Sequence, residues 1–127
     1  MTFVKNYFEL DVYLLSRELA KEVYLISKRF PLEEKFSLTD QIRRASRSVG
    51  AQIAESWAKR KYVNHFISKL TDSDAEQYET RHWIEVAYDY NLVSSEELNS
   101  VVLKCDQINR KLNAMISKAN LFCSTNS

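Results

Sequence analysis

Apolar residues recur at every third or fourth position along four stretches of the chain, which is the spacing of an amphipathic helix. In the first stretch the repeating positions are Val12, Leu15, Leu19, Val23 and Ile26. Phe30-Pro31 follows directly, and the residue before a proline is disfavoured in the helical conformation. The pattern therefore predicts a first helix over residues 10–29 with one face in a core.

The second helix is predicted over residues 37–60 and the third over residues 63–90. The core stripe of the second helix is Leu38, Ile42, Ala45, Val49 and Ile53. Ser37 and Asp40 have the spacing of a capping box, with Asp in place of the usual Glu or Gln. The middle of the third helix, TDSDAEQ, is polar and weakly helical, which allows a local distortion there. Asn91 suits the stop of that helix.

The fourth helix, predicted over residues 95–119, has the most regular pattern. Its stripe alternates spacings of three and four through Leu98, Val101, Cys105, Ile108, Leu112, Met115 and Ala119. Ser94 and Glu97 have capping-box spacing before it, and residues 120–127 show no pattern, so we expect a frayed tail. Four such helices with short connections predict an all-α, antiparallel up-down-up-down four-helix bundle that forms a single domain over residues 1–127.

The amino-acid composition agrees with a helical domain, and it also indicates in which cellular compartment the protein is expected. The 127 residues include one glycine and one proline, too few for a turn-rich β fold, and 45% are hydrophobic. No stretch has the length of a membrane span, and the amino terminus lacks the apolar run of a secretory signal. Cys105 and Cys123 are then expected as reduced thiols, and the protein is expected to be soluble and cytoplasmic, without a membrane partner.

The sequence offers no constellation for catalysis, metal binding or cofactor binding. His65 and His82 are seventeen residues apart, and only His82 has a glutamate, Glu79, three residues earlier. A dinuclear carboxylate bundle uses this Glu-x-x-His motif on each of two helices, so one motif does not complete the site. A single glycine excludes a glycine-rich phosphate loop. We therefore expect a protein that is not an enzyme, with no catalytic residue, no metal site and no cofactor.

The face of the second helix opposite its core stripe is unusual in composition. Its first half carries the cations Arg43, Arg44 and Arg47, and its second half carries the small residues Gly50, Ala51, Ala54 and Ala58. Small residues allow another backbone to approach, which favours a subunit interface. Alanines can also stand on a surface merely because they favour helix, but that preference does not explain Gly50. We favour the interface and a homo-oligomer.

Charges are segregated along the chain although the net charge is only +1. Residues 35–69 contain eight lysines and arginines against two acids, and residues 72–97 contain eight acids against one arginine. The basic segment could bind phosphates, or the two segments could form ion pairs within or between subunits. The charges alone do not separate these alternatives. The candidate nucleic-acid-binding residues are Arg43, Arg44, Arg47, Lys59, Arg60 and Lys61.

The segment FPLEEKFSLTDQIRRASRSVGAQIAES resembles the signature of the small four-helix-bundle proteins encoded in intervening sequences of bacterial large-subunit ribosomal RNA genes. That signature reads F-P-x-x-E-x-[FY]-x-L-x-x-Q-[IL]-R-R-A-x-x-S-[IV]-x-x-N-I-A-E-G. The matching residues are Phe30, Pro31, Glu34, Phe36, Leu38, Gln41, Ile42, Arg43, Arg44, Ala45, Ser48, Val49, Ile53, Ala54 and Glu55. Gln52 and Ser56 depart from the family's asparagine and glycine.

The resemblance implies a bundle that assembles as a ring, most simply a homopentamer, and kinship with the accessory protein of diversity-generating retroelements, which works with a reverse transcriptase and its RNA. We thus expect a non-enzymatic homo-oligomer that binds RNA or DNA. The alternative is a scaffolding oligomer with a protein partner and its arginines in ion pairs. Arg43 and Arg44 belong to the signature and can serve architecture, so Lys59, Arg60 and Lys61 are the cations more available to phosphate.

Overall fold

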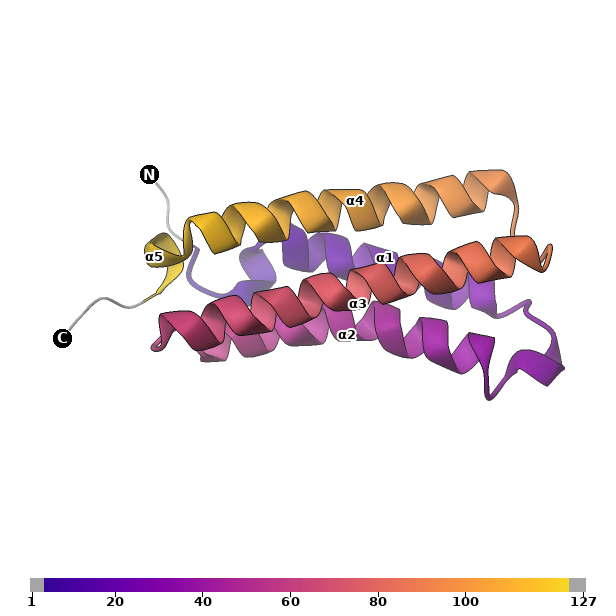
Figure 1. Cartoon of the computed structure of the whole chain (residues 1–127), viewed down its shortest axis with the longest axis horizontal. Helices are drawn as coiled ribbons and strands as arrows, with labels where there is room; N and C mark the ends of the chain where they lie inside the picture. The colour runs from indigo at the N-terminus through magenta and orange to yellow at the C-terminus, as the bar shows by residue number, and fades with distance from the viewer. Residues whose placement is uncertain (1–3, 124–127) are drawn as a thin grey trace.

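Four long helices form an antiparallel bundle in the computed structural model, which describes residues 4–123 (Figure 1). The elements in chain order are η1 (Tyr7–Glu9), α1 (Asp11–Ser27), η2 (Leu32–Glu34), α2 (Leu38–Ala58), α3 (Val63–Asp89), α4 (Ser95–Ser117) and α5 (Ala119–Phe122). Each long helix packs along the next, and α4 returns to α1. The predicted all-α, up-down-up-down four-helix bundle is confirmed.

The core is built from the apolar stripes that the sequence shows. One fully buried residue from each helix illustrates this: Leu19 in α1, Ile53 in α2, Phe66 in α3 and Ile108 in α4. Complete burial of such side chains contributes about 1.5–3 kcal/mol each. The bundle is therefore held mainly by the match of four apolar faces.

The middle of α3 adds a polar layer to this core. The Ser73 hydroxyl donates a hydrogen bond to the Val49 carbonyl of α2 at 2.8 Å. Gln77, only 1% exposed, donates from Nε2 to Asp74 Oδ1 at 2.9 Å, and Asn109 Nδ2 of α4 donates to the same oxygen at 3.0 Å. The local distortion that this polar segment suggested is not found, because α3 is one continuous helix. Ser73 and Asp74 have partners on neighbouring helices, whereas Gln77 bonds within α3 and its Oε1 has no hydrogen-bond partner among the described residues.

The two predicted capping boxes have different outcomes. At α4 the Glu97 N–H donates to Ser94 Oγ at 3.1 Å and the Ser94 N–H donates to Glu97 Oε1 at 2.9 Å, so this box is confirmed. The Ser37 box was wrong, because the Ser37 side chain makes no cap. Glu34 in the preceding turn accepts both the Ser37 hydroxyl at 2.8 Å and the Leu38 N–H at 3.2 Å.

The prediction of a frayed tail over residues 120–127 is wrong for residues 120–122. Residues 119–122 form the short helix α5, and the Phe122 ring stacks on the buried Phe66 ring with centroids 6.0 Å apart. This long-range aromatic contact supplies an anchor that no local pattern reveals. Residues 124–127 lie outside the described residues.

An ion pair joins the end of α1 to the start of α4. The Arg29 guanidinium donates to Glu97 Oε1, the same oxygen that caps α4. The hydrogen bond from Arg29 is the main reason that the pKa of the Glu97 carboxyl lies below its ordinary value. Because the pKa is lowered in the folded state, this carboxylate stabilises the protein above the ordinary glutamate pKa, and its contribution is lost as the pH falls through the acid range.

The capping difference predicts unequal effects of two equivalent substitutions. Ser94→Ala should lower the free energy of unfolding by about 1 kcal/mol, because it removes the acceptor of a first-turn N–H group. Ser37→Ala is the matched control and should cost much less, since Ser37 does not cap α2. Urea unfolding followed by circular dichroism measures both. Equal losses would contradict this assignment of the two helix starts.

The Arg29–Glu97 pair predicts a pH-dependent difference between the wild-type protein and Glu97→Gln. At neutral pH the variant should be less stable, because an uncharged amide replaces the carboxylate beside Arg29. Below about pH 4 the gap should narrow, since Glu97 of the wild type then becomes protonated. Urea unfolding at a series of pH values measures the gap. A gap that widens as the pH falls would contradict the sign of the pKa shift.

Candidate functional site

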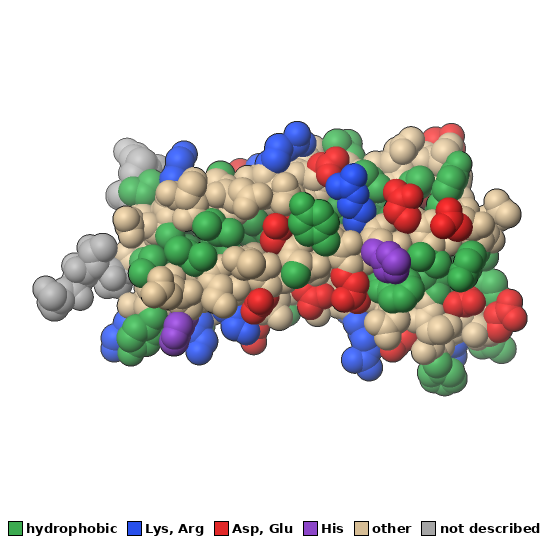
Figure 2. Space-filling model, viewed as in Figure 1, with side chains coloured by type: hydrophobic (Ala, Val, Ile, Leu, Met, Phe, Trp, Pro, Cys, Tyr) green, Lys and Arg blue, Asp and Glu red, His purple; other side chains and the backbone are tan. Residues whose placement is uncertain are grey.

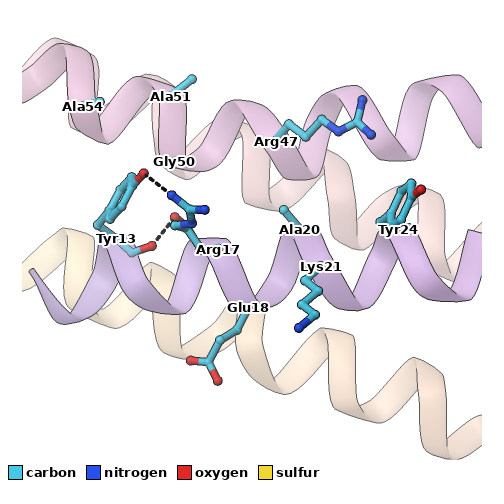
Figure 3. Close-up of a pocket in the computed structure, with 11 residues that line it drawn as sticks. Tyr13, Arg17, Glu18, Ala20, Lys21, Tyr24, Arg47, Gly50, Ala51 and Ala54 are labelled. Carbon is cyan, nitrogen blue, oxygen red and sulfur yellow. Dashed lines mark hydrogen bonds between the residues drawn. The ribbon is translucent and has the colours of Figure 1, made fainter. Parts of the chain in front are cut away.

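An open groove runs between α1 and α2 (Figure 3). It has a volume of about 840 Å³, and small residues make much of its floor. The residues from α2 are Arg47, Gly50, Ala51 and Ala54, and α1 contributes Tyr13, Ser16, Arg17, Glu18, Ala20, Lys21 and Tyr24. Three of the four residues predicted for an interface thus lie in one groove, and Ala58 lies beyond it on exposed surface of α2.

The close approach of α1 to α2 within one chain explains why residue 50 is a glycine. A Cβ atom at Gly50 would lie 2.8 Å from Ser16 Oγ and 3.6 Å from the Tyr13 ring. The Ser16 hydroxyl is held there because it donates to the Tyr13 carbonyl at 2.6 Å. The glycine that favoured a subunit interface therefore has an intramolecular role, and the small surface open to a neighbour is that of Ala51, Ala54 and Ala58.

Arg43 and Arg44, the first arginines of α2, both have partners elsewhere than in α3. Neither forms an ion pair with the acids of α3. Arg43 Nε donates to Ser27 Oγ at 2.7 Å, and its guanidinium lies over the Tyr24 ring at 5.1 Å. Arg43 is therefore a bridge between α1 and α2. Arg44 is exposed and pairs with Asp40 one turn earlier at 3.0 Å. Arg47 is exposed at the groove.

The other predicted cations gather where α2 turns into α3. We call this place the α2–α3 corner, defined by Trp57, Lys59, Arg60, Lys61, Tyr62 and His65. Lys59 and Lys61 are exposed, and the described part of the chain contains no ion-pair partner for either. Arg60 is held in place, because its Nε donates to the Trp57 carbonyl at 2.9 Å and its guanidinium lies 3.7 Å from the centre of the Trp57 ring.

Positive charge at the α2–α3 corner has no local compensation. The sequence from Ser56 to Thr71 contains no aspartate or glutamate. Glu55, the acid just before it, already pairs with Lys69 at 3.3 Å. The first turn of α3 has neither a side-chain cap nor an acid, so its free N–H groups are positive, while the carbonyl end of α2 at the same corner has the opposite sign. Figure 2 shows basic side chains around a histidine at this end, and acidic side chains mixed with further basic ones along the rest of the visible face.

A hollow of about 600 Å³ opens beside the corner. Its lining includes Trp57, Arg60, Lys61, Tyr62 and Phe122. Cys123 also lies there, and partial burial raises the pKa of its thiol while Arg60 opposes the shift. Sequence reasoning identified the cations of the corner but missed its aromatic residues. The alternation WAKRKY, in which aromatic residues flank three cations, was the available signal.

The middle of α3 is the acidic counterpart of the corner. Partial burial, together with the neighbouring charges of Glu79 and Asp72, raises the pKa of the Glu76 carboxyl. This surface therefore carries negative charge that the described residues do not fully balance. Arg81 pairs instead with Asp106 of α4.

Other classes of site find little support in the described residues. Residues 4–123 contain no group of three His, Cys, Asp or Glu side chains placed to hold a metal ion. Burial raises the pKa of the Cys105 thiol to about 12, so it stays protonated at neutral pH and is a poor nucleophile. Within the same range no helix combines the length and the apolar character needed to cross a membrane.

The fold and these surfaces define a small helical-bundle protein with a basic end and an acidic side. The chain belongs to the family of 23S rRNA-intervening sequence proteins, whose pattern it matches over residues 8–114. It is also similar to a protein of unknown function from the S23 ribosomal protein family of Bacteroides thetaiotaomicron VPI-5482. The two are 28% identical with a TM-score of 0.74, and the match covers 84% of this chain and 95% of that one. No curated protein matches the chain.

Proposed function

We propose that this protein is a non-enzymatic, homo-oligomeric bundle that binds nucleic acid, RNA or DNA, through the α2–α3 corner. The observation that carries the proposal is a pair of exposed lysines, Lys59 and Lys61, that have no ion-pair partner within residues 4–123 and lie in a stretch of sixteen residues without an acid. Membership of a family named for an rRNA intervening sequence supports it. We place this activity in the cytoplasm, a compartment of which two unpaired thiols are typical.

The α2–α3 corner is better able to bind the phosphates of a nucleic-acid backbone than a protein carboxylate at one fixed position. Lys59 and Lys61 are flexible point charges, and Arg60 presents a guanidinium already oriented by Trp57. Contacts of this kind recognise a phosphate backbone without reading its sequence. Arg44 can extend the basic surface along α2, whereas Arg47 lies at the groove between α1 and α2. Arg43 is left out, because its guanidinium is used between α1 and α2.

The double substitution Lys59→Gln with Lys61→Gln should weaken binding of an RNA hairpin with single-stranded flanks. Each lysine that neutralises a phosphate releases counterions, so the slope of log K against log salt concentration should fall by about 2. Fluorescence anisotropy at several salt concentrations measures this slope.

The matched control is Lys28→Gln with Lys35→Gln, which removes the same charge from exposed positions at the opposite end of the bundle. The control should leave the slope unchanged. Equal losses in both double variants would show that only total charge matters. An absence of wild-type binding at low salt would refute the proposal.

We also propose that the groove between α1 and α2 receives a second copy of the chain, and that a head-to-tail contact of this kind closes a ring, most simply a homopentamer. Ala51 and Ala54 leave room there, and the cations that line the groove, Arg17, Lys21 and Arg47, outnumber its one acid, Glu18. The acidic middle of α3 has the complementary charge. Contact between two different surfaces of one chain generates rings when the rotation closes.

The substitution Ala51→Arg should break this assembly, because it places a long charged side chain in the small-residue groove. Light scattering measures the mass. The wild-type protein should have a mass near five times the 14.9 kDa of one chain, and the variant should shift to a smaller species. Asn99→Arg adds the same side chain to exposed α4 surface and should change nothing. A monomeric wild type would contradict the ring.

A scaffolding role is the second candidate function, and a specific feature favours it. Leu32 and Phe36, beside η2, are 83% and 86% exposed. Large apolar side chains this exposed mark sites where another protein is bound, when they lie together. A protein partner would then dock at the end opposite the α2–α3 corner (Figure 1). The hairpin titration separates the two functions, since a scaffold has no need of the corner lysines.

A further inference from the structure

The α2–α3 corner presents an aromatic ring among its cations. Tyr62 directly precedes α3, and its side chain is 56% exposed. The His65 ring lies beside it, with centroids 5.4 Å apart and planes tilted by 49°. Lys61 Nζ lies 5.9 Å from the centre of the Tyr62 ring. Tyr62 thus provides a broad aromatic surface at the point where positive charge is densest.

The Trp57 ring of the α2–α3 corner is already covered by the Arg60 side chain. Trp57 is 8% exposed, and the Arg60 guanidinium lies 3.7 Å from the centre of its ring. A planar ligand therefore finds no open face on Trp57. Tyr62 and His65 are the rings of the corner that solvent reaches, and Tyr62 lines the hollow beside Phe122.

Aromatic residues beside cations elsewhere in the described chain lack this combination. Tyr24 has Lys28 at 4.8 Å and Arg43 at 5.1 Å from its ring, but Glu22 lies two residues before it. Tyr13 lies near Arg17, but Asp11 lies two residues before it, and Phe36 lies near Lys35 directly after two glutamates. Tyr62 is an exposed ring that directly follows three cations in the sequence, and its nearest acids in sequence are Glu55 and Asp72.

An exposed ring of this kind discriminates between nucleic-acid forms. In a duplex both faces of each base are covered by its neighbours, so only the backbone can meet the corner. In a single strand an unpaired base can stack on an aromatic side chain while its phosphates remain near cations. Stacking tolerates any base, because every base has a π face.

We propose that the α2–α3 corner selects single-stranded nucleic acid, with one unpaired base stacked on Tyr62 and the adjacent phosphates held by Lys59 and Lys61. This inference rests on the proposed function and adds the form of the ligand. His65 packs against Tyr62 and limits the positions its ring can adopt.

The test compares Tyr62→Leu with the wild-type protein on two probes, a single-stranded RNA and a perfectly paired RNA duplex of the same length. Tyr62→Leu should weaken binding of the single strand about tenfold. Duplex affinity should not change, because the lysines remain. Tyr62→Phe keeps the ring and should bind the single strand like the wild type. A single-stranded DNA of the same sequence shows whether the 2′-hydroxyl contributes to the site.

Tyr90→Leu is the matched control. Tyr90 directly follows α3 at its other end and is 57% exposed, so both substitutions remove a tyrosine of nearly equal exposure next to the same helix. Tyr90→Leu should bind both probes like the wild type. Circular dichroism and thermal unfolding of each variant report whether the bundle is intact.

The outcomes separate this inference from the proposed function. If wild-type protein binds both probes through Lys59 and Lys61 but Tyr62→Leu changes neither affinity, the stacking inference is overturned and backbone binding stands. An equal loss on both probes in Tyr62→Leu also overturns it, because the ring would then not distinguish a paired from an unpaired base. If neither probe binds at low salt, both proposals fail together.

Discussion

The position of α3 depends on a small set of hydrogen bonds at the middle of its core face. Ser73 bonds to the α2 backbone, and Asp74 accepts hydrogen bonds from Gln77 and from Asn109 of α4. A buried polar group without a partner costs about 1–3 kcal/mol. Sliding α3 along the bundle would therefore be opposed by its two cross-helix partners, Val49 for Ser73 and Asn109 for Asp74, whereas the Gln77–Asp74 bond lies within α3. The same register fixes where α3 begins, and so it fixes the geometry of the α2–α3 corner.

Charge is distributed along this one helix in a way that the net value conceals. The start of α3 adjoins Lys59 and Lys61, whereas its middle carries Asp72, Glu76 and Glu79. A net charge of +1 would suggest little electrostatic attraction for any partner. Within a distance of about 8–10 Å, however, an approaching ligand responds to local charge rather than to the total. The proposed nucleic-acid site and the proposed subunit contact can therefore coexist on a nearly neutral chain.

The sequence predicted what depends on local periodicity and missed what depends on contacts between distant segments. The apolar stripes and the Ser94 cap need only neighbouring residues, and both are confirmed except at one position. The pattern placed Tyr88 of α3 in line with Phe66 and Ile84, but Tyr88 is 41% exposed. Phe122 orders the start of the tail through a ring 56 residues earlier in the sequence. Gly50 similarly depends on Ser16 of another helix. The corner cations were visible in sequence, but the open face of Tyr62 depends on the fold.

Cations within a helix and cations in a turn differ in the partners available to them. Along α2, Arg44 finds Asp40 one turn earlier, and Arg43 finds Ser27 and Tyr24 on the adjacent helix. A side chain in the turn after α2 has no such regular neighbours on both sides. Arg60 is held because its guanidinium lies over the Trp57 ring, whereas the side chains of Lys59 and Lys61 are exposed. This end of the bundle thus places the charges of Lys59 and Lys61 next to the exposed Tyr62 ring. A flexible single strand can contact both at once.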